Sequence, residues 1–240
     1  MASCFDLSGR VAVVIGATSG IGAAIAVGLA EHGATVVPAG RRAPEWVVDV
    51  TDRPSVDALR DKILDRYGRL DILVNAAGYT FRQPTQTVCE RQWADLLDTD
   101  LTGSLRTCQA FHTALKASGK GRVVNIASLG SFVAFQEVAA YCAAKTGLLS
   151  LTRSLAVEWA RDGICVNAIA PGLFPTGMTA PLIMGTPRGS ELLQRTPMAR
   201  FGRPEELVGA VVLLASDAAS FLTGQCITVD GGFLASGVNV

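Results

Sequence analysis

VAVVIGATSGIG, residues Val11 to Gly22, is the stretch that decides the fold. It begins with five apolar, mostly β-branched residues and continues through a glycine-rich turn into a helical pattern. Because glycines divide the uncharged run from Val11 to Ala30, it predicts a strand, a loop and a helix instead of a membrane-spanning segment. Such a turn lets the backbone approach a pyrophosphate, which the amino end of the helix attracts. The candidate dinucleotide contacts are Gly16, Thr18, Ser19, Gly20, Ile21 and Gly22.

Similar valine- and isoleucine-rich runs recur along the chain and alternate with helical patterns. Strands are predicted at Val11–Ile15, Thr35–Ala39, Leu70–Asn75, Arg122–Ala127, Cys165–Pro171 and Gln225–Val229. Helices are predicted at about 20–32, 53–67, 88–98, 103–118, 138–161 and 204–215. Strands that are apolar on both faces predict an α/β fold: a doubly wound, Rossmann-type parallel sheet with helices on both faces. No linker or repeat divides the chain, so residues 1–240 are predicted to form one domain.

One connection in this pattern is unusually short. About a dozen residues, with Pro44 among them, separate the second predicted strand from the helix that starts at 53. We therefore expect no full crossover helix there.

The composition limits the classes of partner. The chain is 49% hydrophobic and carries 21 basic and 21 acidic side chains, which excludes disorder and leaves no net charge to attract nucleic acid. We expect a small-molecule substrate, and neither a nucleic-acid nor a membrane partner. Six cysteines without a C-x-x-C pair predict buried thiols in a reducing cytoplasm, with no zinc or other metal site. A broad apolar stripe predicts burial against a second subunit; it comprises Leu148, Leu149, Leu151, Leu155 and Trp159.

Further motifs follow in order along the chain. They are Asn75-Ala76-Ala77-Gly78, Ser128, Tyr141-Cys142-Ala143-Ala144-Lys145, Pro171-Gly172 with Thr176, and Val229-Asp230-Gly231-Gly232. With the G-x-x-x-G-x-G spacing of the first turn, they resemble the short-chain dehydrogenase/reductase family over essentially the whole chain. The resemblance implies a nicotinamide-dependent oxidoreductase that interconverts a secondary alcohol and a ketone, assembled as a homotetramer.

Three of these residues have the chemistry that proton exchange requires. Tyr141 and Lys145 are four positions apart and share one helix face, where an ammonium next to a phenol favours phenolate. Ser128 precedes Tyr141 by 13 residues and follows a strand, so it is placed to hydrogen-bond a substrate oxygen. The resemblance implies that all three are catalytic.

The fourth catalytic position of the family, 41 residues before Tyr141, departs from its pattern. The family has asparagine there, whereas this sequence has Asp100. A carboxylate cannot donate an amide N–H, and its charge raises the pKa of Lys145. This departure questions the proton relay that the resemblance implies. We expect Asp100→Asn to retain or raise turnover.

The end of the second strand carries the signal for cofactor choice. It reads Pro38-Ala39-Gly40-Arg41-Arg42, with glycine where an acid would bind the ribose hydroxyls of NAD. Arg41 and Arg42 favour the 2′-phosphate of NADP, although NAD and a merely solvated turn stay open as alternatives. The resemblance implies further cofactor contacts at Asp49, Val50, Asn75, Ala76, Ala77, Gly78, Tyr141, Lys145, Asn167, Pro171, Gly172 and Thr176.

Two segments bear on the substrate. The proline-interrupted stretch at about 173–200 resembles the family's substrate loop, and its apolar side chains either line a pocket or form a core within the loop. The segments 195–207 and 229–236 resemble sugar-acid and polyol dehydrogenases of the gluconate 5-dehydrogenase type. Two alternatives stay open: a 3-oxoacyl carrier-protein reductase, for which a basic docking patch is expected, and a cofactor-binding protein with impaired catalysis.

Overall fold

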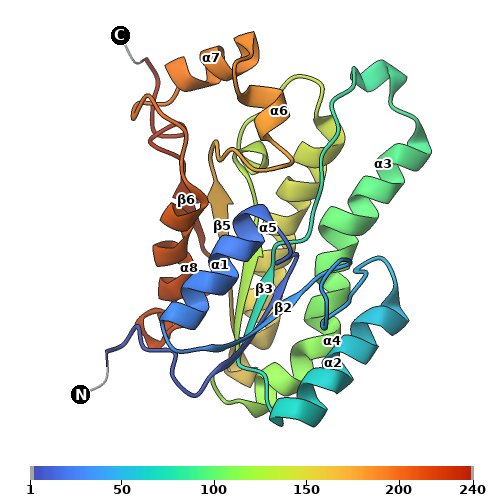
Figure 1. The fold of residues 1–240 in the computed structure, drawn as a ribbon, viewed down its shortest axis with the longest axis vertical. Helices are drawn as coiled ribbons and strands as arrows, with labels where there is room; N and C mark the ends of the chain where they lie inside the picture. Colours follow the sequence, from blue (N-terminus) through green and yellow to red (C-terminus); the bar gives the residue numbers. More distant parts are fainter. Residues whose placement is uncertain (1–2, 239–240) are drawn as a thin grey trace.

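The computed structural model describes residues 3–238, which contain a single six-stranded parallel sheet (Figure 1). Its strands are β1 (Val11–Ile15), β2 (Thr35–Ala39), β3 (Ile72–Asn75), β4 (Arg122–Ile126), β5 (Cys165–Pro171) and β6 (Cys226–Val229). Its helices are α1 (Gly20–Glu31), α2 (Arg53–Tyr67), α3 (Glu90–Leu97), α4 (Gly103–Ala117), α5 (Ala139–Trp159), α6 (Ala180–Ile183), α7 (Pro187–Gln194) and α8 (Val208–Ala215). The strand order β2-β1-β3-β4-β5-β6 confirms the predicted doubly wound architecture.

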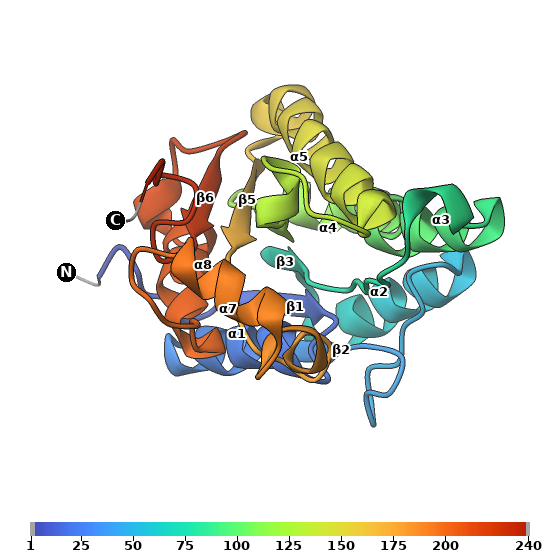
Figure 2. The same ribbon diagram turned by 90° about the horizontal axis from the view of Figure 1, so that it is seen from above.

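Helices cover both faces of this sheet. Figure 2 shows α1 and α8 on one side, with α2, α4 and α5 on the other. Successive residues of β1 point to opposite faces, so Val13 packs with Phe111 of α4 while Val14 packs with Ile25 of α1. All five residues of β1 are buried. This two-sided burial explains why the strand is apolar throughout instead of alternating.

Strand β2 forms one edge of the sheet and has no helix directly after it. The Gly40 N–H donates to the Trp46 carbonyl at 3.1 Å, and the Val48 N–H donates to the Gly40 carbonyl at 3.2 Å. This short return confirms that residues 40–52 contain no crossover helix. Trp46 is buried and stacks on Tyr67 of α2, with ring centroids 6.1 Å apart, so one side chain fills the space beside the sheet.

The predicted helices occur within a few residues of their expected bounds, with three local differences. A π-helical turn, Asp98–Thr102, joins α3 to α4, and a 3-10 turn, Pro204–Leu207, precedes α8. The segment 173–200, expected as a loop, contains α6 and α7. Thr186 caps α7 by accepting the Gly189 N–H at 3.0 Å, a local signal that composition alone does not reveal. No helix among residues 3–238 is long and apolar enough to cross a membrane.

The structure corrects the prediction that the six cysteines are buried. Of the six cysteines, Cys4 and Cys89 are exposed, and only Cys108 is fully buried. Cys89 lies outside the core because its Sγ accepts the Gln92 N–H at 3.4 Å and caps α3. Within the stripe on α5, Leu148, Leu149 and Leu155 are buried inside the chain, whereas Leu151 and Trp159 are only partly buried. Burial of the stripe against a second subunit stays a prediction.

Candidate functional site

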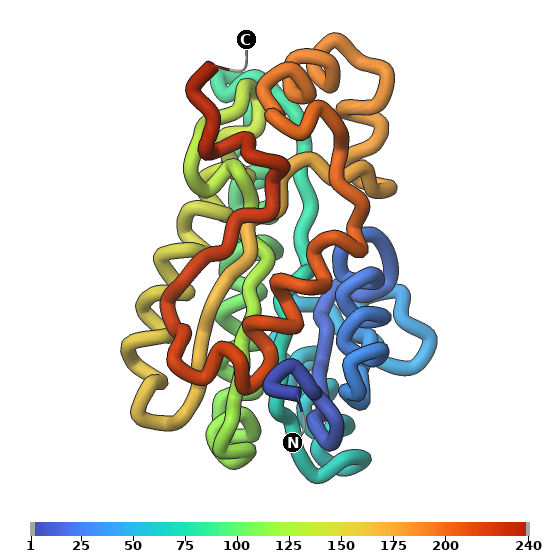
Figure 3. Tube along the Cα trace, turned by 90° about the vertical axis from the view of Figure 1, so that its left-hand side faces the viewer, coloured from blue at the N-terminus to red at the C-terminus, as the bar shows by residue number. Residues whose placement is uncertain are grey.

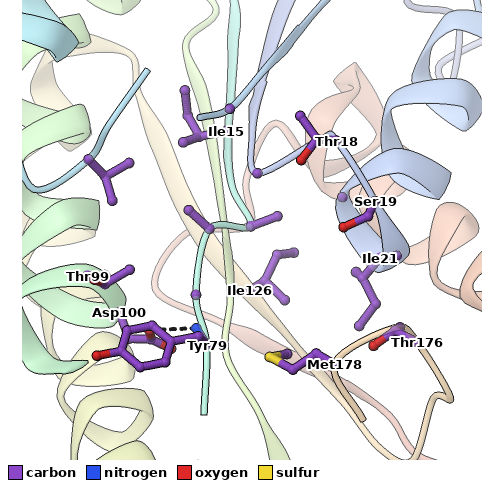
Figure 4. A pocket seen from close by; sticks show the side chains of 18 of the residues that line it. Ile15, Thr18, Ser19, Ile21, Tyr79, Thr99, Asp100, Ile126, Thr176 and Met178 are labelled. Atoms are coloured by element: carbon purple, nitrogen blue, oxygen red, sulfur yellow. Dashed lines mark hydrogen bonds between the residues drawn. The ribbon is translucent and has the colours of Figure 1, made fainter. Parts of the chain in front are cut away.

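A cavity of about 280 Å³ opens at the carboxyl ends of the strands, where the loops after β1 and β3 lie side by side (Figure 4). The connections from β1 and β3 leave in opposite directions here, because β2 lies on one side of β1 and β4 lies beyond β3. Open parallel sheets bind ligands at such a switch point. Loops that are far apart in sequence line the cavity.

The glycine turn after β1 depends on the absence of side chains. Gly16 has φ +89°, and a Cβ there would lie 2.6 Å from the Ala77 nitrogen of the neighbouring loop. A Cβ on Gly22 would lie 2.3 Å from the Gly16 carbonyl oxygen. Ser19, at the amino end of α1, makes no side-chain cap, and the first turn of α1 holds no acid. The free N–H groups and positive dipole of α1 therefore suit a pyrophosphate.

The loop after β2 supplies the positive end of the cavity. Arg41 and Arg42 are exposed and line it. A Cβ on Gly40 would lie 3.0 Å from Cγ2 of Thr18, so a larger residue at position 40 crowds this wall. Asp49 accepts hydrogen bonds from the hydroxyl and the N–H of Thr51, and these hold its pKa below the usual range.

Ser128, Tyr141 and Lys145 meet at the other end of the cavity. Ser128 follows β4, and its Oγ accepts the Gly130 N–H at 3.1 Å. Lys145 follows Tyr141 by one turn of α5, and its Nζ lies 5.6 Å from the centre of the tyrosine ring. The same ammonium donates to the Ile126 carbonyl oxygen at 3.2 Å. A hydroxyl, a phenol and a cation therefore line one wall.

Asp100 lies under this wall, in the π-helical turn between α3 and α4. Its side chain is fully buried; Oδ1 accepts the Tyr79 N–H at 2.9 Å, and Oδ2 lies 3.3 Å from Lys145 Nζ. Burial raises the pKa of Asp100, and the Lys145 charge opposes this only in part. Burial acts to lower the pKa of Lys145, but the Asp100 carboxylate, together with Tyr141, raises it overall. An ion pair is thus enclosed beside the reacting wall.

The structure brings nearly all the predicted site residues to this cavity. The exceptions are Asn75, whose side chain bonds Asn125 and Thr107 beneath the floor, and Asn167, which bonds the Leu222 carbonyl and the Gln225 N–H. Both amides hold neighbouring segments together and do not line the cavity. Sequence reasoning missed three polar lining residues: Tyr79, Thr99 and Thr179. Tyr79 directly follows the 75–78 motif, and Thr99 precedes Asp100. Their position next to predicted site residues could therefore have identified them.

The segment 173–200 contributes both to the cavity and to a small core of its own. Phe174 and Met178 line the cavity. Leu182 and Ile183 instead pack into a small core with Phe233 from the chain's last segment, which runs beside α6 and α7 in Figure 3. Met184 is 53% exposed and belongs to neither. Of the two alternatives, the pocket wall therefore applies to Phe174 and Met178, and the core within the segment applies to Leu182 and Ile183.

Comparisons with known proteins agree with this geometry. The family model described as Enoyl-(Acyl carrier protein) reductase matches residues 16–234. The gluconate 5-dehydrogenase of Gluconobacter oxydans is 39% identical over 97% of each chain. The D-threitol dehydrogenase of Mycolicibacterium smegmatis is 37% identical, over 95% of this chain and 94% of that protein. The chain belongs to the short-chain dehydrogenase/reductase family.

A solved member of the family has the same architecture. It is a gluconate 5-dehydrogenase from Burkholderia cenocepacia in complex with NADP and tartrate, which superposes with a TM-score of 0.94 at 35% identity and covers 97% of this chain. As a short-chain dehydrogenase/reductase, the chain is an oxidoreductase. No three His, Cys, Asp or Glu side chains gather as metal ligands within residues 3–238.

Proposed function

We propose that the protein is an NADP(H)-dependent oxidoreductase that interconverts a secondary alcohol and a ketone, on a sugar acid, a polyol or a similar small substrate. One observation carries the proposal: Ser128, Tyr141 and Lys145 line the same cavity as the glycine turn and Arg41. NADP(H), when bound, supplies the hydride acceptor or donor. The similarity to gluconate 5-dehydrogenases and a threitol dehydrogenase supports the substrate class.

The residues at the reacting end take separate roles. Tyr141 exchanges the proton of the substrate hydroxyl, and Ser128 hydrogen-bonds the same oxygen and polarises it as a carbonyl. Lys145 stabilises the phenolate electrostatically and lies where it can also bond the nicotinamide ribose. Asp100 acts on Lys145 and not on the substrate. Ser128, Tyr141 and Lys145 are thus the proposed catalytic residues, and Asp100 acts through Lys145.

The remaining contacts orient the cofactor. Gly16 to Gly22 would bind the pyrophosphate, with Ala76, Ala77 and Gly78 of the adjacent loop lining the cavity beside them. The guanidinium groups of Arg41 and Arg42 would bind the 2′-phosphate, because they are exposed and no acid competes at Gly40. Asp49 and Val50 would contact the adenine. The last proposed contacts, on the side of β5, are Pro171, Gly172 and Thr176.

We further propose that residues 1–240 work as one catalytic domain whose segment 173–200 closes over the substrate. Figure 1 shows α6 and α7 beyond the carboxyl ends of the strands, where they would exclude water from the reaction. The stem of this segment is held by the Gly202 N–H, which donates to the Leu173 carbonyl at 2.9 Å.

The test measures initial rates of nicotinamide reduction with sugar acids, polyols and simple secondary alcohols, supplying NADP and NAD separately. A rate that needs Tyr141 and prefers NADP supports the proposal; Tyr141→Phe serves as the paired control. A folded protein that binds NADP without turnover on this panel or on the matching ketones would contradict it and favour the impaired cofactor-binding protein.

A second candidate rests on the similarity to the 3-oxoacyl-[acyl-carrier-protein] reductase of Vibrio cholerae, which is 35% identical over 95% of this chain and 98% of that protein. The charge balance of 21 basic to 21 acidic residues gives no overall attraction to an acidic carrier. Oxidation of NADPH with a 3-oxoacyl thioester, and none with ketoses or keto acids, would establish this candidate instead.

Assembly and location complete the proposal. We propose a homo-oligomer, a tetramer by family resemblance, in the cytoplasm. Phe221 is fully exposed and Val157 on α5 is 80% exposed, so apolar surface is available for subunit contacts. The six cysteines are free thiols, as a reducing compartment requires. Light scattering on the purified protein would measure the number of subunits.

A further inference from the structure

Asp100 is a buried charge whose hydrogen bonds are incomplete. It is the one residue of the described chain that carries a buried side-chain oxygen without a hydrogen-bond partner, and that oxygen is Oδ2. Oδ2 lies 3.3 Å from Lys145 Nζ and forms an ion pair with it, while the same ammonium donates a hydrogen bond to the Ile126 carbonyl. The pair is enclosed in a position where water does not screen its charges.

Few other groups face the pair. Asp100 faces Lys145 of α5 and the Tyr79 N–H of the loop after β3; Lys145 also faces Tyr141, and β4 contributes only the Ile126 carbonyl. Asp95 on α3 acts on Tyr79 and is mostly exposed. With Asp100 ionised, Lys145 and its partner sum to no net charge beside the phenol.

We propose that Asp100 is a positioning residue that cancels the Lys145 charge next to Tyr141, so that alcohol oxidation needs more alkaline conditions than it would with an uncharged residue at 100. The inference rests on the proposed function. In oxidation, hydride leaves the carbinol carbon for the nicotinamide of NADP⁺, and the hydroxyl proton passes to the Tyr141 phenolate. Reduction reverses both transfers and needs the neutral phenol. Asp100 therefore moves the pH range of each direction upward.

The substitution Asp100→Asn isolates this charge. Its amide oxygen still accepts the Tyr79 N–H, so the loop after β3 keeps its anchor. We expect the acid limb of kcat/KM for oxidation, and the alkaline limb for reduction, both to move to lower pH. At pH values below the midpoint of the acid limb, kcat/KM for oxidation should rise about tenfold, because the Lys145 charge is then no longer cancelled beside Tyr141. Asp95→Asn, an equally neutralising change at an exposed carboxylate, should leave both profiles in place.

A second measurement needs no substrate. The chain has three tyrosines, so subtracting the ultraviolet titration of Tyr141→Phe from that of the parent isolates the ionisation of Tyr141. The same subtraction in the Asp100→Asn background should place this ionisation at lower pH. Because the titration uses the protein without substrate, it remains decisive even if the proposed reaction is wrong.

Several outcomes would overturn the proposal. One is a uniform fall in rate with unmoved pH limbs, since that indicates a purely structural role for Asp100. Another is an unchanged Tyr141 ionisation in the Asn background. If Asp100→Asn does not fold, the parent titration decides: Tyr141 fully ionised by about pH 8 contradicts a cancelled Lys145 charge, and a neutral phenol at that pH supports it.

Discussion

At the amino ends of the strands, buried arginines have a nearly complete set of partners, whereas at the carboxyl ends a buried acid does not. Arg10 donates to the Ala215 carbonyl at 3.0 Å and pairs with Asp217 at 2.7 Å. Arg122 donates to the carbonyls of Gly121 and Ser216. At the opposite end, Asp100 Oδ2 lacks any hydrogen bond.

The difference separates stability from chemistry. The buried arginines at the amino ends are engaged by carbonyl and carboxylate partners within the protein. They hold the strands and the turn after α8 in place instead of binding a ligand. The buried pair of Asp100 and Lys145 at the carboxyl ends instead sets the net charge beside Tyr141. Stability and turnover should therefore respond to different substitutions, and each prediction below tests one side of this division.

Tyr141→Phe should cause the largest change. Removing the proton-exchanging hydroxyl should lower kcat by about a thousandfold, because general acid–base groups contribute on this order. The free energy of unfolding should stay nearly constant, since the ring keeps its packing. Initial rates and urea denaturation measure the two quantities. Equal loss of stability would mean that this end of the sheet is structural as well.

Asp217→Ala should break the amino-end cluster while sparing activity. It leaves two buried guanidinium groups without their shared carboxylate, and we expect about 2 kcal/mol less stability, a value reduced because Asp217 is 43% exposed. Lys120→Ala removes the exposed partner of the same carboxylate and should cost under about 0.5 kcal/mol. Urea denaturation compares the three proteins; similar effects of both changes would refute the assigned role of the buried arginines.

Arg41→Ser tests an exposed arginine of the cavity, in contrast to the buried Arg10 and Arg122 at the amino ends of the strands. We expect the KM for NADP to rise about tenfold and the KM for NAD to change little, because only NADP has the 2′-phosphate. Stability should not change, as Arg41 is exposed. Saturation kinetics with both cofactors measure this. An equal rise for NAD would show that the side chain shapes the turn without reading the phosphate.

The smallest expected effect is the loss in acid of the stabilisation that Asp217 contributes. Arg10 and Lys120 lower the pKa of Asp217 in the folded chain, so its stabilisation is full above the unfolded value and is lost as pH falls through the folded one. The difference in unfolding free energy between the parent and Asp217→Asn should be constant above about pH 5 and shrink below about pH 4. A difference that grew on acidification would have the wrong sign.

Much of the sheet could be predicted because its strands are covered on both faces. Val11–Ile15 could hardly be anything but a buried strand, and the spacing from Gly16 to Gly22 follows from contacts that permit no side chain. The shortness of the 40–52 connection likewise follows from the number of residues between the second predicted strand and the next helix. These features depend on local sequence, so one sequence suffices to find them.

The parts that escaped prediction depend on tertiary contacts. The π-helical turn carrying Asp100 packs against α5, and its 3.3 Å approach to Lys145 joins residues 45 positions apart. Spacing indicated that Asp100 belongs to the site, but not that Oδ2 lacks a hydrogen bond. Asn75 matched a motif and nevertheless lies beneath the cavity, because Thr107 and Asn125 bind its amide.

Strand β2 has a consequence for how the molecule behaves at high concentration. The backbone N–H and C=O groups of residues 35, 37 and 39 point toward β1. Those of residues 36 and 38, and of residue 40 just after the strand, point away from the sheet. Pro38 has no N–H to offer, and the Gly40 N–H is already bound to Trp46. A strand from another molecule would find a single donor, at Val36, along this edge. This edge of the sheet is thereby protected against edge-to-edge aggregation, and Pro38→Val would be the change that exposes it.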